Sequence, residues 1–168
     1  MNFLEELLSE WYEYYYDCFI KKNISFGEGK NTEEIDILAY NPEKGIVYHI
    51  ETINFVKSKK KQKEEILKKF ENAEKYYKKI LNLPEYKIEK IVVVDDVKRV
   101  DNVLEELFTK NIKVVAVEEI ITDICAELLS QKNSYCLVPE KYSLIRTVYY
   151  AIEIIFKELN EKFCNTGR

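Results

Sequence analysis

The sequence predicts an α/β fold organised around one mixed β-sheet. Two largely apolar segments, IEKIVVVDD at 88–96 and IKVVAVEE at 112–119, have the length and composition of strands buried on both faces. Amphipathic helical patterns lie between and around these runs. Alternating helices and buried strands are typical of a sheet that helices cover on both sides. With 168 residues, the chain is long enough to form one such core.

The first half of the chain predicts a helix followed by a hairpin. Apolar side chains recur at helical spacing over residues 3–22, so we expect a helix there. The glycine-containing stretch 23–33 is expected to form a loop. Two strands follow at about 34–40 and 46–53, separated by the turn sequence NPEKG. The hairpin would be the first part of the sheet.

The second half predicts helices that alternate with the two buried strands. A long, charged helix is expected over about 60–82, ending before a proline. Further helices are expected at about 99–110 and 119–131. A last amphipathic helix, at about 141–163, carries a broad apolar stripe that either caps the sheet or forms a two-fold dimer. We expect a single domain over 1–168, in which 1–130 form the core and 131–168 a helical extension.

Composition and motifs exclude several classes of protein. No run of 18 apolar residues occurs, so no membrane span is expected. The N-terminus is acidic, unlike that of a signal peptide, so we expect a cytoplasmic protein. The net charge of −4 gives no general attraction to nucleic acid. The chain lacks a glycine-rich phosphate loop and a Gly-x-Ser-x-Gly motif, so we set aside nucleotide-cofactor enzymes and serine hydrolases. The four scattered cysteines predict neither a zinc site nor disulfides.

Acidic side chains in the middle of the hairpin are the main functional signal. Asp36 lies between two isoleucines on the first strand, and a buried carboxylate without a partner is costly. His49 and Glu51 are two residues apart on the second strand, so their side chains point to the same face of the sheet. Two oxygen ligands from paired strands suit Mg²⁺ or Mn²⁺, with water and substrate phosphate completing the shell. Such a metal can activate water for attack on a phosphoryl group.

The first helix offers a third acid. On a helical wheel centred on Trp11, Glu10 lies on the flank beside Leu7 and Tyr14. Glu13 points to the opposite side, towards solvent. Glu10 is therefore the expected third metal ligand.

The motif EEIDILA, a short hairpin and VYHIET resemble the core of the PD-(D/E)XK nuclease superfamily, which has the restriction-endonuclease-like fold. The order of elements over residues 3–130 is similar as well. The resemblance implies metal-dependent hydrolysis of DNA phosphodiester bonds, with Asp36 and Glu51 as the metal ligands. The sequence departs from the family at the lysine that normally follows the glutamate by two positions, because that position is Ile53.

Three explanations for the missing lysine remain open. The lysine has moved in sequence: Lys57 lies on the same nominal face of the strand, and Lys61 or Lys63 could reach in from the next helix. Alternatively, the Glu-x-Lys motif begins two residues earlier, so that His49 and Glu51 form the catalytic pair. In the third explanation the site is inactive, and the domain binds nucleic acid or a protein partner.

A basic segment follows the hairpin directly. Residues 57–69 contain seven lysines and two glutamates. Such a run is commonly a solvated helix face. In a nuclease it would contact DNA phosphates with salt-dependent affinity. The expected nucleic-acid-binding residues are Lys57, Lys59, Lys60, Lys61 and Lys63.

Overall fold

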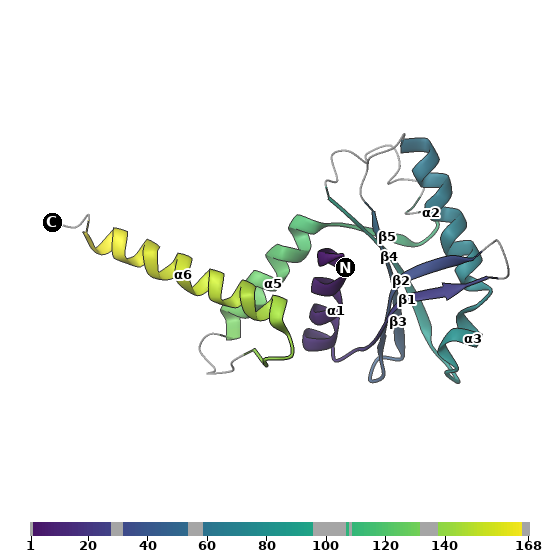
Figure 1. Ribbon diagram of the computed structural model, residues 1–168, viewed down its shortest axis with the longest axis horizontal. Helices are drawn as coiled ribbons and strands as arrows, with labels where there is room; N and C mark the ends of the chain where they lie inside the picture. Colours follow the sequence, from purple (N-terminus) through teal and green to yellow (C-terminus); the bar gives the residue numbers. More distant parts are fainter. Residues whose placement is uncertain are drawn as a thin grey trace. The chain divides into compact units, whose positions relative to one another are not determined.

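The computed structural model describes two compact units of the chain, which are considered separately (Figure 1). They are Met1–Glu119 and Ile120–Arg168. The described residues are 2–27, 32–53, 59–95, 107, 109–131 and 138–165. For residues 59–63 and 159–165 the description covers the backbone and not the side chains.

The first unit contains a five-stranded mixed sheet in the order β1-β2-β3-β4-β5. Strands β1, β2 and β3 are antiparallel neighbours, whereas β3, β4 and β5 run parallel. This confirms the α/β class and the mixed sheet. The strands are β1 Phe19–Phe26, β2 Glu33–Asn41, β3 Ile46–Ile53, β4 Lys87–Val94 and β5 Ile112–Ala116.

Helices lie on both faces of the sheet in this unit. Figure 1 shows α1 on one side and α2 with α3 on the other. Asn2 caps α1 by accepting a hydrogen bond from the backbone N–H of Leu4 at 3.2 Å, which satisfies one of the unpaired donors at the helix start. The helices of the two units together are α1 Phe3–Tyr15, α2 Lys59–Glu74, α3 Tyr77–Leu81, α5 Val117–Gln131 and α6 Ser143–Asn165.

The α2 face of the sheet carries most of the core that supports the site. A buried stripe along α2 and α3 repeats at intervals of four, three and four residues, which keeps it on one side of a helix. It packs against apolar side chains of the sheet, including Val92 and Ile35. The members of the stripe are Ile66, Phe70, Ala73 and Tyr77.

The sequence prediction is wrong about residues 16–26. The predicted helix over 3–22 ends at Tyr15, and β1 occupies residues that were assigned to the helix and to the loop that follows. Asp17 has a φ of 49°, in the left-handed region, and this ends the helix and turns the chain into the strand. The strand is missed because it forms the edge of the sheet and buries little of its surface.

The other elements follow the prediction closely. The charged segment 60–82 forms a helix with a break at 75–76, so that α3 starts at Tyr77. Asn82 ends α3 with a φ of 52° and donates its N–H to the carbonyl of Lys78. The predicted helix at 99–110 falls almost entirely outside the described residues.

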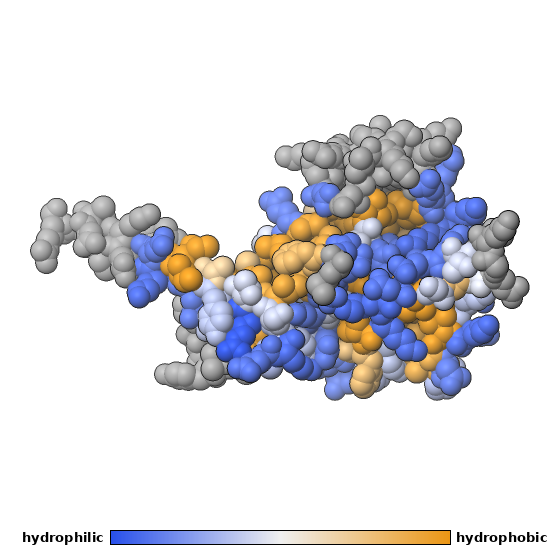
Figure 2. Space-filling view, viewed as in Figure 1, coloured by the Kyte–Doolittle hydropathy of each residue, from blue (hydrophilic) through white to orange (hydrophobic). Residues whose placement is uncertain are grey.

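The second unit contains nearly all of α5 and the whole of α6. Both predicted helices are confirmed. Figure 2 shows apolar side chains at the surface of α6, where Ile154 and Ile155 are 60% and 55% exposed. Across the described ranges, no helix combines the length and apolar character that crossing a bilayer requires.

Candidate functional site

The hairpin places the two predicted acids opposite each other. Strands β2 and β3 pair with Ile37 opposite Ile50, so the next positions, Asp36 and Glu51, face each other across the two strands. Residues directly opposite in an antiparallel pair point to the same side of the sheet. Both carboxylates therefore lie on the side that α2 covers.

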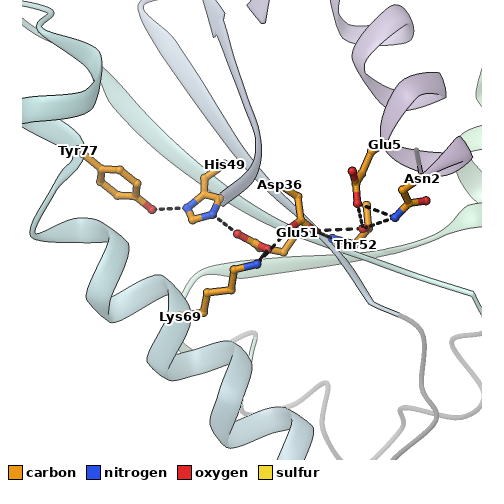
Figure 3. Close-up of polar contacts among 8 residues, drawn as sticks. All are labelled: Asn2, Glu5, Asp36, His49, Glu51, Thr52, Lys69 and Tyr77. Atoms are coloured by element: carbon orange, nitrogen blue, oxygen red, sulfur yellow. Dashed lines mark hydrogen bonds and ion pairs between the residues drawn. The ribbon is translucent and has the colours of Figure 1, made fainter. Parts of the chain in front are cut away.

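Lys69 of α2 joins the two carboxylates. Its ammonium lies 3.1 Å from Asp36 Oδ1 and also contacts Glu51 Oε2 (Figure 3). Lys69 lies beside the buried stripe of α2, three residues after Ile66 and next to Phe70. The helix therefore directs its long side chain along the sheet surface towards the acids. The side chain of Glu51 is 3% exposed and that of Lys69 is 29% exposed. The ammonium is thus at the entrance and Glu51 at the bottom of the site.

A buried histidine holds the other oxygen of Glu51. His49 Nε2 lies 2.6 Å from Glu51 Oε1, and its Nδ1 contacts the hydroxyl of Tyr77. His49 has no exposed surface, and its ring packs against Phe70 with centroids 4.5 Å apart. The three groups form a continuous chain from α3 to the carboxylate (Figure 3).

The N-terminal helix reaches the other side of the site through Thr52. The backbone N–H and the hydroxyl of Thr52 donate to Asp36 Oδ2 at 2.7 and 3.1 Å. The Thr52 hydroxyl also lies 3.3 Å from Glu5 Oε1, and Asn2 donates to the same Glu5 oxygen at 2.5 Å. The start of α1 is thereby connected to Asp36.

Burial shifts the ionisation of the cluster. The pKa of Glu51 is raised to about 9, mainly by burial and secondly by the nearby charge of Asp36, whereas the Lys69 ammonium acts in the opposite direction. Burial, and then Lys69 and Lys90, lower the pKa of His49 to about 3. Burial alone would lower the pKa of Lys69, but Glu51 and Asp36 outweigh it and raise that pKa. At neutral pH the cluster thus holds a proton on Glu51, a neutral imidazole and a charged lysine.

An open hollow of about 360 Å³ gives solvent access to Asp36 and Lys69. Its lining contains four acids and two lysines, so it is more attractive to cations than to phosphate. The lining residues are Glu33, Glu34, Asp36, Glu65, Lys68 and Lys69.

Asp36 and Glu51 supply oxygen donors, the kind of ligand that Mg²⁺ prefers. Asp36 and Glu51 present carboxylates that already converge on one positive charge, the ammonium of Lys69. Among the described residues no group of three acidic, histidine or cysteine side chains is arranged to hold a metal. Mg²⁺ needs only one or two protein carboxylates, because it keeps water and substrate phosphate as its other ligands. Asp36 and Glu51 are the residues that would hold it.

The structure brings three of the predicted residues together. Asp36, His49 and Glu51 form one connected cluster. Glu10 lies on α1 and is partly buried, whereas the contacts from this end of the chain to Thr52 come from Asn2 and Glu5. Lys57 lies outside the described residues. For Lys59, Lys60, Lys61 and Lys63, the structure describes a helical backbone, and their side chains lie outside the described part.

Sequence reasoning missed Lys69 and Tyr77. Both lie on α2 or α3, and Lys69 is the last of seven lysines in its segment. One signal was available: on a helical wheel, Lys69 lies next to the apolar stripe that includes Ile66 and Phe70. A lysine at the border of a buried stripe can reach across the sheet, whereas lysines on the opposite face cannot.

Comparisons with known proteins give no family assignment: no family model matches the chain, and no curated protein matches it. The resemblance to PD-(D/E)XK nucleases therefore stays a prediction. It rests on the sequence motif and on the order of elements along the chain.

Proposed function

We propose that the protein is a metal-dependent nuclease that hydrolyses DNA phosphodiester bonds at Asp36, Glu51 and Lys69. The observation that carries the proposal is the Lys69 ammonium, which contacts both carboxylates of the paired strands. Lys69 supplies from α2 the amine that Ile53 cannot supply from β3. The proposal thereby gives the departure from the family motif a physical explanation.

The residues have separate roles in the proposed reaction. Asp36 and Glu51, the latter after losing its proton to solvent, would hold Mg²⁺ or Mn²⁺, which would activate water and neutralise charge that develops on the phosphate. The raised pKa of Lys69 keeps its ammonium protonated, so it acts as a charge that orients the phosphate and not as a base. Once a cation occupies the carboxylates, Lys69 can turn towards the substrate in the hollow.

The basic start of α2 is the proposed DNA-binding surface. Lysines there would contact backbone phosphates, and affinity would fall steeply as salt rises. Two copies joined through the apolar stripe of α6 would present two such sites to a duplex. The proposed location is the cytoplasm, where the substrate would be cellular DNA.

A catalytically inactive binding module is the second candidate, and one observation favours it. All four carboxylate oxygens of Asp36 and Glu51 already contact protein groups, which are Lys69, Thr52 and His49. A polar network satisfied in this way can be purely structural. The domain would then bind nucleic acid or a protein partner without cutting.

A cleavage assay with an isosteric variant separates the two candidates. We expect wild type to cut plasmid, single-stranded or branched DNA with Mn²⁺ or Mg²⁺ and to be inactive in EDTA. Asp36→Asn should lower the rate at least about 100-fold, because it removes a charge from the cation site. Glu43→Gln, at an exposed position in the turn between β2 and β3 and outside the lining of the hollow, should cut as wild type does. A folded wild type that cuts none of these substrates would leave only the binding module.

A further inference from the structure

The side of Glu51 that faces away from Lys69 is held by two enclosed residues. His49 contacts Glu51 Oε1 through Nε2 and contacts the Tyr77 hydroxyl through Nδ1. His49 has no exposed surface and Tyr77 is 4% exposed. Side chains this deeply enclosed cannot touch a nucleic-acid substrate. Any part that they play in function must therefore be exerted through Glu51.

We propose that His49 and Tyr77 are positioning residues that hold the Glu51 carboxylate in the orientation that binds a divalent cation. The inference rests on the proposed function of the Asp36–Glu51 site. Groups hydrogen-bonded to a metal ligand commonly fix its orientation, and their removal weakens metal binding by a factor of about 10 to 100.

The packing around His49 supports this role. β3 supplies both His49 and Glu51, while Tyr77 comes from the first turn of α3. The Tyr77 ring lies edge-on to the imidazole, at 5.6 Å between centroids, and Phe70 covers the imidazole from α2. The imidazole is thus clamped by two rings and hydrogen-bonded at both nitrogens. With the Tyr77 hydroxyl removed, one ring nitrogen loses its partner, and the orientation of Glu51 is no longer enforced from α3.

The contact between Tyr77 and His49 depends on the break between α2 and α3. Tyr76 accepts backbone hydrogen bonds from Lys79 and Ile80, which restart the helix after the interruption at 75–76. Tyr77 is therefore the first residue of a new helix, and its side chain reaches the interior of the sheet face. Tyr76, one position earlier, packs its ring against Phe26 instead. The two adjacent tyrosines make a matched pair for experiment.

Calorimetric titration of the 168-residue chain with Mn²⁺ tests the proposal. Tyr77→Phe keeps the ring that fills the core and removes only the hydroxyl. We expect it to raise the Kd for Mn²⁺ about tenfold. Tyr76→Phe should bind Mn²⁺ as tightly as wild type. Equal Mn²⁺ affinity in Tyr77→Phe and wild type would overturn the proposal.

A second measurement distinguishes failure of the positioning role from failure of the proposed function. His49 is the only histidine, so its ring nitrogens can be observed selectively by NMR without metal. Tyr77→Phe should shift both the His49 nitrogen resonances and the carboxyl carbon resonance of Glu51, and Tyr76→Phe should shift neither. If wild type binds no Mn²⁺, the proposed nuclease fails while these resonances still decide the positioning role. An unchanged Glu51 carboxyl resonance in Tyr77→Phe would overturn it.

Discussion

Lys69→Met should destabilise the protein by about 2 kcal/mol and eliminate DNA cleavage while leaving the site able to bind Mn²⁺. Removing one partner from a buried ion pair typically costs roughly 3–5 kcal/mol, and the partial exposure of Lys69 reduces that figure. Methionine keeps most of the apolar stem, so the loss comes mainly from removing the ammonium that contacts both Asp36 and Glu51. Loss of the orienting charge should lower the cleavage rate at least about 100-fold.

The effect on metal binding separates a catalytic lysine from a structural one. Without the ammonium, Asp36 and Glu51 have no positive charge between them, so Mn²⁺ should stabilise Lys69→Met more than it stabilises wild type. Thermal unfolding with Mn²⁺ or EDTA measures this difference. Lys68→Met is the matched control, because Lys68 is exposed and lines the same hollow. Cleavage by Lys69→Met at the wild-type rate would contradict the proposed role of Lys69.

Stability in EDTA should fall as pH rises from about 6.5 to 9. Folding raises the pKa of Glu51 from 4.5 to about 9, so its contribution is present at low pH and is lost as pH rises through the folded value. Above pH 6.5 the unfolded state holds no proton on His49 or Glu51, whereas the folded state holds one on Glu51. The free energy of unfolding should decrease by about 1 kcal/mol per pH unit over this range.

The pKa of His49 is lowered on folding, and this changes how the stability of the protein depends on pH below 6.5. Between pH 4.5 and 6.5, the folded and unfolded states each hold one proton on the pair, so the pair contributes no slope there. Below pH 4.5 the unfolded state holds two protons, so stability falls again on acidification towards pH 3. Urea unfolding across this range measures the profile.

Glu51→Gln supplies the decisive variant for the pH profile. An amide cannot ionise, so the decline between pH 6.5 and 9 should disappear. Glu65→Gln, at an exposed position in the lining of the hollow, should keep the wild-type slope. A wild-type profile that stays flat up to pH 9 would show that Glu51 is already ionised at neutral pH.

The acids could be predicted from sequence because their placement is a local property of the hairpin. The turn NPEKG fixes the register of β2 and β3, and alternation along each strand then determines which residues share a face. Asp36 and Glu51 consequently lie where the pattern indicates. The same local reasoning places His49 on the face of Glu51.

Lys69 could not be identified in the same way, because its contact depends on how α2 docks on the sheet. Seven lysines in a thirteen-residue segment offer several candidates, and sequence alone gives neither the start of the helix nor its position along β3. Tyr77 depends further on the break at 75–76. Strand β1 was missed for a different reason: an exposed edge strand has a weak apolar alternation, and Asp17 ends the preceding helix without a proline or glycine.

The most direct test of the account is the anomalous diffraction of a crystal of the wild-type protein soaked in Mn²⁺. The central claim is that Asp36 and Glu51 form a cation site whose charge Lys69 balances in the absence of metal. We expect a manganese peak bound to both carboxylates, with the Lys69 ammonium moved away from them towards the hollow. A crystal without a peak there, in which Lys69 still bridges Asp36 and Glu51, would contradict it.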